Sequence, residues 1–166
     1  MRSHIASAPA HNQHGTAMTN DNTALFDNLV RYEIDLWIAI DKALQGECDL
    51  HLTWFEILRL LDAHDGGVRV QDIAAEFAIT VGGTSKVVDR IEAAGYCARR
   101  ANPDDRRSSL VALTPAGREI LAAGTVVFDR ELDRRIGAVL DDDTIRAVGS
   151  ALEMLRAAGR SADSSR

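Results

Sequence analysis

The stretch that most constrains the fold of this chain is residues 80–117, TVGGTSKVVDRIEAAGYCARRANPDDRRSSLVALTPAG. Thr80 occupies the position of a helix N-cap, and residues 81–94 after it predict a helix. Gly95 follows where the C-terminal cap of that helix would fall. The apolar residues that recur at helical spacing, and that we expect in the core, are Val87, Val88 and Ile91.

The second half of this stretch predicts a β-hairpin. Residues 96–100 and 108–113 are short strand candidates, and the turn-forming cluster at 102–105 (NPDD) separates them. Thr114 and Pro115 then provide an N-cap and a first-position proline for another helix.

One more helix is predicted immediately upstream, at residues 70–78 (VQDIAAEFA). Only a tight turn separates it from the helix at 81–94, and the hairpin follows that second helix. This order is typical of a winged helix-turn-helix, in which the second helix enters the major groove of DNA and the hairpin forms the wing. The expected fold class is therefore mainly α with a small β-hairpin wing.

A set of short motifs runs through this region: Gln71-Asp72-Ile73-Ala74, Ser85, Val88-Asp89-Arg90-Ile91-Glu92, Ala94-Gly95, Asn102-Pro103-Asp104-Asp105-Arg106-Arg107 and Leu113-Thr114-Pro115-Ala116-Gly117. With them, residues 52–117 closely resemble the MarR family of bacterial regulators (multiple-antibiotic-resistance repressors). The resemblance extends more loosely over residues 25–158. It implies a homodimeric DNA-binding transcription factor, a repressor of a palindromic operator that a small ligand releases.

Charge is unevenly distributed along the chain. The whole chain carries −6 with a sequence pI of about 5.3, which taken alone argues against nucleic acid as a partner. Residues 80–118, however, hold seven basic and four acidic side chains, so this segment is locally positive. Because the field at the docking face governs DNA binding, the segregation is compatible with a DNA reader. A solvated charged hairpin is the alternative.

Helices with apolar stripes are predicted at both ends of the chain. The helix at 23–45 is apolar on more than one side, so it must be buried on more than one side. Residues 115–158 predict two further striped helices. The resemblance implies that these end helices interdigitate to form a homodimer. A core helix within a monomer is the alternative for the first of them.

The winged helix-turn-helix is expected over residues 53–115, and Thr53 with Glu56 has capping-box spacing at its start. We expect a single MarR-like domain at 21–158, between flexible tails at 1–20 and 159–166. The first tail either is mobile or reflects a start placed too early, with Met18 as the native start.

The N-terminal end of the helix at 81–94 is the expected reader of base edges. Its two glycines cost helix stability, which reflects either close approach of the backbone to DNA or the tolerance of helix starts for glycine. Arg90 can contact a base in bidentate fashion, or can pair with Asp89 or Glu92 on the surface. The DNA contacts predicted here are Val81, Gly82, Gly83, Thr84, Ser85, Lys86 and Arg90.

The hairpin tip supplies the other predicted contacts, Asp105, Arg106 and Arg107. Asp105 and Arg107 are two apart, so in an extended strand both side chains point to one side, and the carboxylate would hold the guanidinium. Arg106 would point the other way, toward phosphate or solvent. The resemblance implies that Arg107 enters the minor groove, where narrow A/T-rich segments concentrate negative potential.

An apolar effector pocket is expected where the helix at 23–45 and the helix beginning at Thr53 meet the winged helix-turn-helix. The resemblance implies small aromatic acids or phenols as ligands, whereas plain core packing is the alternative for each aromatic residue. The predicted lining residues are Tyr32, Trp37, His51, Trp54 and Arg59.

Other chemistries find little support. The chain has no G-x-S-x-G, Walker loop or GxGxxG, so we expect no enzyme, no catalytic residue and no cofactor. Cys97 is expected to be a packing residue. Cys48 and its polar neighbours at 47–51 leave a metal- or redox-sensing regulator as an alternative. Zinc-sensing relatives need further histidines after the wing, however, and this chain has none after His64, so no metal site is predicted.

No apolar stretch is long enough to span a membrane, and residues 1–20 lack the apolar core of a signal peptide, so a cytoplasmic protein is expected. The opposing functional class is a winged helix that binds a protein partner instead of DNA. Salt-dependent binding to a palindromic duplex separates these two classes.

Overall fold

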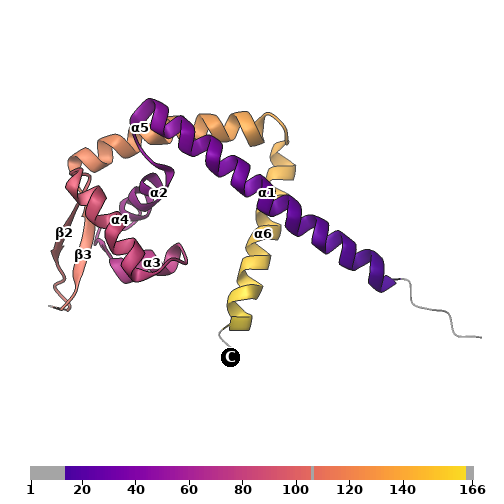
Figure 1. Cartoon of the computed structure of the whole chain (residues 1–166), viewed down its shortest axis with the longest axis horizontal. Coiled ribbons are helices and arrows are strands. Elements are labelled where there is room, and N and C mark those ends of the chain that lie inside the picture. The colour runs from indigo at the N-terminus through magenta and orange to yellow at the C-terminus, as the bar shows by residue number, and fades with distance from the viewer. Residues whose placement is uncertain (1–13, 106, 164–166) are drawn as a thin grey trace, which may run out of the picture. The chain divides into compact units, whose positions relative to one another are not determined.

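The computed structural model describes residues 14–105 and 107–163, with the side chains of residues 21–105 and 107–159. It divides into two units, Met1–Trp37 and Ile38–Arg166. The first helix, α1 (His14–Cys48), crosses the boundary between them (Figure 1). The sequence predicts a tail at 1–20, but residues 14–20 are helical and residues 1–13 lie outside the described part.

Helix α1 exposes large apolar side chains along much of its length. The most exposed are Phe26 at 64% and Ile38 at 60%. Others are Leu25, Leu29, Val30, Tyr32, Ile34 and Trp37. These exposed apolar side chains occupy more than one side of α1 within the described residues, in keeping with the apolar pattern of the sequence.

Three helices form the body of the second unit: α2 (Leu52–Asp62), α3 (Val70–Glu76) and α4 (Val81–Ala93). Ala78 has a φ of 51° in the turn between α3 and α4, which makes the turn tight. The fully buried side chains around which these helices pack are Leu44, Leu50, Phe55, Ile57, Leu58, Ile73, Val88, Ile91, Cys97 and Val111. Val88 and Ile91 are buried in the core as predicted, whereas Val87 is only half-buried.

The sheet has three antiparallel strands in the order β1-β3-β2. The hairpin of β2 (Cys97–Ala101) and β3 (Ser109–Leu113) follows α4 and pairs Cys97 with Leu113. The strand β1 (Val68–Arg69) precedes α3 and pairs Val68 with Val111. The sequence does not predict β1, because two residues carry no alternation and only pairing with a distant strand defines them.

The helix caps agree with the sequence at three places and differ at one. Thr80 accepts a bond from the backbone of Gly83 at 3.1 Å, Gly95 has a φ of 81°, and Thr114 caps the helix begun by Pro115. At α2 the predicted capping box is wrong. The helix begins at Leu52, whose N–H donates to Asp41 Oδ1 of α1 at 2.8 Å.

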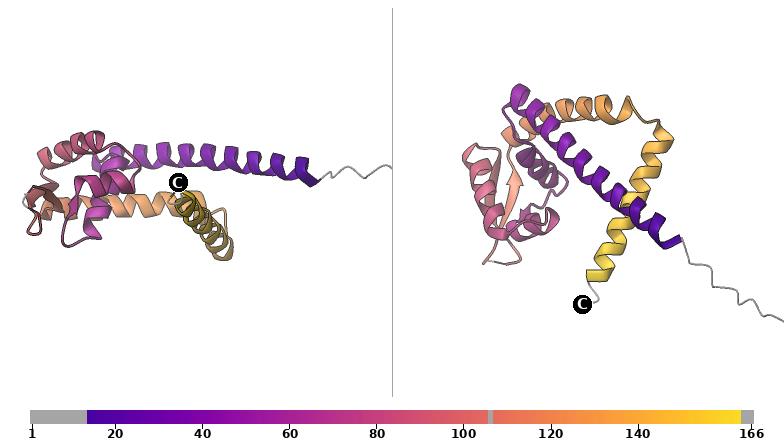
Figure 2. Two further views of the ribbon diagram at one scale, coloured as in Figure 1. Left: turned by 90° about the horizontal axis from the view of Figure 1, so that it is seen from below. Right: turned by 45° about the vertical axis from the view of Figure 1, so that its right-hand side comes forward.

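The C-terminal part comprises α5 (Pro115–Leu132), a π-helical turn (Asp133–Gly137) and α6 (Asp142–Asp163), and the chain bends between α5 and α6 (Figure 2). Residues 115–158 thus form two successive helical segments, as predicted, with a break before Asp142. Asp141 Oδ1 accepts from Thr144 N–H at 2.8 Å, and this bond lowers the pKa of the Asp141 carboxyl. None of the helices in the described segments has the length and hydropathy needed to cross a bilayer.

Candidate nucleic-acid interface

The first turn of α4 presents a short, little-obstructed surface. Val81 is 54% exposed, and Gly82 and Gly83 are also exposed. A Cβ added at Gly82 would meet no atom within 4 Å, whereas one at Gly83 would lie 3.1 Å from Thr80 Oγ1. Packing within the chain therefore does not require glycine at position 82. The space outside the helix at this position is open.

Thr84, one of the predicted DNA contacts, is not accessible to DNA in the structure. Its side chain is fully buried, and its hydroxyl donates to the carbonyl oxygen of Thr80 at 3.0 Å. Because this bond satisfies the hydroxyl within the helix, threonine packs here as a small apolar residue would.

The remaining predicted residues of α4 lie on its accessible side. Lys86 and Arg90 are exposed, and Ser85 is half-buried. Among the described residues, neither Lys86 nor Arg90 forms an ion pair, so the alternative that Arg90 pairs with Asp89 or Glu92 is wrong. Both carboxylates bind Arg99 instead, which leaves two basic side chains available on the outer face of α4.

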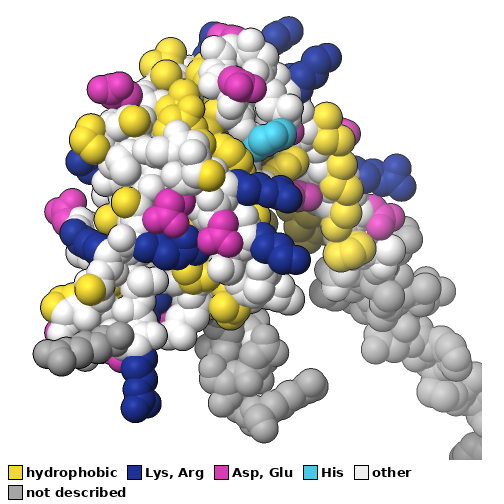
Figure 3. Space-filling model, turned by 60° about the vertical axis from the view of Figure 1, so that its left-hand side comes forward, with side chains coloured by type: hydrophobic (Ala, Val, Ile, Leu, Met, Phe, Trp, Pro, Cys, Tyr) yellow, Lys and Arg dark blue, Asp and Glu magenta, His cyan; other side chains and the backbone are white. Residues whose placement is uncertain are grey.

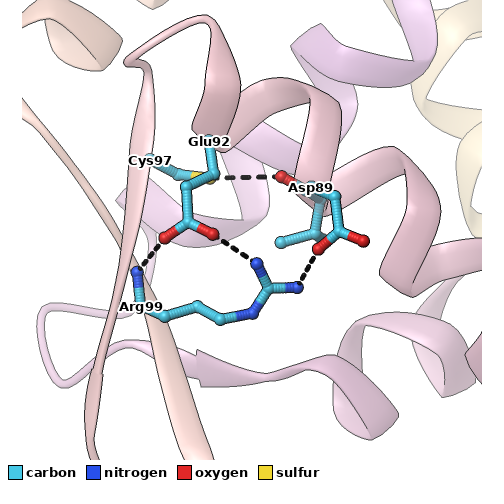
Figure 4. A network of polar contacts seen from close by, with 5 residues as sticks. Asp89, Glu92, Cys97 and Arg99 are labelled. Carbon is cyan, nitrogen blue, oxygen red and sulfur yellow. Dashed lines mark hydrogen bonds and ion pairs between the residues drawn. The ribbon is translucent and has the colours of Figure 1, made fainter.

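A network centred on Arg99 joins α4 to the wing (Figure 4). One terminal guanidinium nitrogen of Arg99 bonds to Glu92 Oε2, and the other bonds to Asp89 Oδ1 at 2.7 Å. The backbone N–H of Arg99 donates to the second oxygen of Glu92 at 2.7 Å. Partial burial lowers the pKa of the guanidinium, but the bonds to Glu92 and Asp89 outweigh that effect and raise the pKa above its usual value. Arg99 is therefore charged.

Arg99 lies outside the family motifs, but the residue spacing in β2 still contains a signal that places it against α4. Cys97 and Arg99 are two apart in β2, so their side chains share one side of the strand. Cys97 is buried with its sulfur 3.9 Å from Val88 O, which places that side against α4. Burial, followed by the charge of Glu92, raises the pKa of the Cys97 thiol to about 11. It therefore stays protonated at neutral pH and acts as a packing residue.

The wing tip is a hydrogen-bonded turn. Asp105 Oδ1 accepts from the backbone N–H of Arg107 at 3.0 Å, and the Asp105 carbonyl accepts from Ser108 N–H at 3.0 Å. The buried Asn102 completes the turn, donating to Ser108 Oγ at 2.9 Å and accepting from Asp104 N–H at 3.0 Å. Arg107 is exposed, and Arg106 lies outside the described residues.

The expected mode of contact between Asp105 and Arg107 is therefore wrong. The two residues lie in a turn between the strands, not in an extended strand, so their side chains need not share a side. The Asp105 carboxylate bonds to the backbone of Arg107 and not to its guanidinium. The carboxylate thus shapes the turn that carries Arg107.

Charge on this side of the molecule is mixed. In Figure 3, which turns the left-hand side of Figure 1 toward the reader, Lys and Arg side chains alternate with Asp and Glu side chains. No continuous basic band appears in that view. Binding of an anionic polymer to this face would therefore depend on the placement of a few cations.

The predicted effector residues are divided between the two units of the chain. Arg59 lines an open hollow of about 640 Å³ between α2 and α5, together with Arg118, Leu121 and Thr125. Its guanidinium carbon lies 5.0 Å from the ring centre of Phe128. His51 is exposed and meets Trp54 edge-on, with ring centres 6.1 Å apart. Tyr32 and Trp37 belong to the first unit, where both are exposed.

The neighbourhood of Cys48 offers little to a metal. Among the described residues, no group of three or more His, Cys, Asp or Glu side chains is placed to hold an ion. Glu47 bonds to Arg130 instead, which raises the pKa of that guanidinium.

The helix-turn-helix, the hairpin wing and the accessible first turn of α4 define a winged helix-turn-helix DNA-binding protein. A family model for the MarR family matches residues 49–108. The HTH-type transcriptional regulator YfiV of Bacillus subtilis is 28% identical over 120 residues, covering 66% of this chain and 71% of YfiV. Residues 49–108 therefore match the MarR family of DNA-binding transcriptional regulators, which confirms the resemblance and the fold class. The matched family and the curated relative are transcriptional regulators, in agreement with the prediction that the protein is not an enzyme.

Solved structures show the same fold. A MarR family regulator from Streptomyces coelicolor in complex with DNA superposes with a TM-score of 0.76 at 19% identity, covering 87% of this chain and 91% of that one. The repressor CouR bound to a 23-mer DNA duplex gives 0.73 at 25%, covering 89% and 99%. CouR from Rhodococcus jostii bound to p-coumaroyl-CoA gives 0.71 at 23%, covering 85% and 95%.

Proposed function

We propose that this regulator is a homodimeric repressor that binds a palindromic operator and leaves it when a small anionic aromatic ligand binds. The observation that carries the DNA part is the likeness to CouR, which is described as a transcriptional repressor bound to a DNA duplex. A cytoplasmic location follows from that partner.

The operator itself is the first thing to find. Genomic fragments retained by the purified protein should share a palindrome, and binding to that duplex should weaken steeply with salt. Transcription in vitro from a promoter that carries the palindrome should fall when the protein is added. Salt-insensitive binding, or no retained palindrome, would favour a protein-interaction module.

We propose that α4 reads the major groove with Val81, Gly82, Gly83, Ser85, Lys86 and Arg90, and that Arg107 of the wing reaches the minor groove. All of these residues are exposed except Ser85, which is half-buried, and this exposure supports the proposal. The absence of ion pairs at Lys86 and Arg90 among the described residues supports it as well. The exposed methyl groups of Val81 suit contact with a thymine methyl.

Replacing Gly82 with alanine should have opposite effects on stability and on DNA binding. Alanine should stabilise the helix by about 0.5–1 kcal/mol, because the added Cβ meets no protein atom. Operator binding should weaken on the order of tenfold, equivalent to about 1.4 kcal/mol, if DNA occupies that space. Thermal melting and operator titration measure the two effects. Gly46→Ala, also open to solvent in a helix, is the control and should leave binding unchanged.

Dimerisation is supported by the unpaired apolar surfaces of the end helices. On α6, Val148, Leu152 and Leu155 recur at helical spacing on one face and are 46%, 37% and 59% exposed. Similar surface runs along α1. A second copy would cover these surfaces, and a two-fold protein matches a palindromic site.

Leu152→Glu should therefore raise the dimer dissociation constant by about 100-fold or more, because each copy would bury an unpaired charge. Met154 is 68% exposed but lies on the opposite side of α6, so Met154→Glu is the matched control and should stay dimeric. Light scattering at micromolar concentration distinguishes the two variants. A stable monomer of the unaltered chain would remove the basis for this proposal.

The hollow between α2 and α5 is our proposed effector site. Arg59 and Arg118 suit a carboxylate or phosphate, and Leu121 and Ala122 suit an apolar group. CouR, with its p-coumaroyl-CoA complex, supports an aromatic acyl ligand. Phenolic carboxylates and their thioesters should raise the melting temperature and weaken operator binding. Arg59→Ala should abolish both responses while operator binding without ligand persists.

A further inference from the structure

We infer that Arg99 is a positioning residue for DNA binding, which holds the wing in register with the recognition helix through Glu92 and Asp89. The inference rests on the proposed function, in which α4 and the wing contact DNA together. Such a reader must present two elements at one spacing, so an interaction that fixes the spacing contributes to affinity without touching DNA.

The geometry of the network restricts movement in more than one direction. Asp89 and Glu92 are three apart in α4 and so lie on one side of the helix. Arg99 donates a hydrogen bond to each of these carboxylates, one from each terminal nitrogen, and its backbone N–H also donates to Glu92. Rotation of α4 about its axis, or sliding of β2 along it, would break at least one of these bonds.

Burial and charge make the network more than a surface ion pair. The side chains of Arg99 and Glu92 are 26% and 35% exposed, so solvent screens their interaction only partly. Asp89 is more exposed, at 59%. It lies beside Arg90 on the proposed DNA-contacting helix, and Arg99 compensates its negative charge. With both terminal nitrogens engaged by carboxylates, the guanidinium is directed at α4.

Glu92→Gln gives a test in which two explanations predict opposite signs. Removing a carboxylate near DNA should tighten binding if only net charge matters, or if Arg99 itself contacts phosphate and is freed. If Arg99 acts as a positioning residue, the same change should weaken specific binding about tenfold, which corresponds to about 1.4 kcal/mol. The salt slope should stay the same, since no phosphate contact is lost.

Glu76→Gln is the matched control. Glu76 is exposed on α3, so this substitution removes the same charge without disturbing the network. It should bind as tightly as the unaltered protein or more tightly. Arg99→Lys is a second variant that keeps the positive charge but cannot bridge both carboxylates in the same fork geometry. It should weaken operator binding with an unchanged slope and leave non-specific DNA binding intact.

The measurements are operator titrations of the full chain at several salt concentrations, with melting curves to show that each variant is folded at the assay temperature. Tight binding by Glu92→Gln, equal to that of Glu76→Gln, would overturn the inference. So would a reduced salt slope for Arg99→Lys. If the unaltered protein binds no DNA, the proposed function itself fails, and that result is distinguishable from both.

Discussion

Gly117→Ala should destabilise the fold by about 3 kcal/mol, the largest effect we expect from a single methyl group in this chain. A Cβ at position 117 would lie 1.9 Å from the carbonyl oxygen of Tyr96 and 2.9 Å from its carbonyl carbon. Both atoms belong to the backbone, so no side-chain rotation can relieve the overlap.

The surrounding bonds explain why the backbone cannot easily move away. Thr114 N–H donates to Tyr96 O at 3.1 Å, and Thr114 Oγ1 donates to Gly95 O at 2.6 Å. The same hydroxyl accepts from Gly117 N–H at 3.0 Å. This cluster fixes the start of α5 against the turn between α4 and β2, and the alanine methyl group would have to force the two apart.

Three glycines provide a graded comparison for this prediction. Gly124→Ala should cost less than Gly117→Ala, because its nearest neighbour, at 2.9 Å, is the Phe55 side chain and not backbone. Gly46→Ala meets nothing within 4 Å and should be neutral or slightly stabilising. Melting temperatures at equal protein concentration should fall by roughly 10 °C for Gly117→Ala. An unchanged melting temperature for that variant would show that α5 has room to shift.

Local signals in the sequence predict the elements around the candidate site. Thr80, Gly95 and Thr114 are identified as caps because each acts through the backbone of residues within a few positions, and the structure confirms all three. The helix-turn-helix and wing follow from these caps and from the apolar spacing between them, so their order is readable without tertiary information.

Features that depend on distant residues are not predictable in this way. Asp41 of α1 replaces the expected capping box at the start of α2, and only the packing of the two helices brings it there. Thr84 carries a polar side chain, so the sequence predicts that it is accessible. It can be buried because its hydroxyl donates to Thr80 O. In the sequence Arg99 counts only as one of the positive charges of residues 80–118. Its bonds to Glu92 and Asp89 on α4 become apparent only in the fold.

The wing is where the expected and observed arrangements lead to different experiments. In the structure, Asp105 accepts from the backbone N–H of Arg107, and the turn needs only an acceptor oxygen at that position. Asp105→Asn keeps such an oxygen and removes a negative charge, so it should bind the operator at least as tightly as the unaltered protein. A carboxylate pairing with the guanidinium would instead make this variant weaker.

Asp105→Ala loses the acceptor and should weaken binding, although charge counting alone says that removing an anion near DNA should strengthen it. Asp104→Ala is the matched control for that charge effect. Asp104 is exposed at the same tip, and its only hydrogen bond among those described is donated by its backbone N–H. It should bind as tightly as the unaltered protein or more tightly.

Arg107→Ala should have the largest effect on binding, costing on the order of 1–3 kcal/mol and lowering the salt slope by about one per subunit, because a phosphate or groove contact is lost. The double variant of Asp105→Ala and Arg107→Ala should bind little worse than Arg107→Ala alone, since shaping the turn has no effect on affinity without the arginine it presents. Titrations of the single and double variants on one operator at fixed salt measure this coupling. Strictly additive losses would show that the turn and the arginine act independently, and equal weakening by Asp105→Asn and Asp105→Ala would show that the carboxylate charge matters more than the turn.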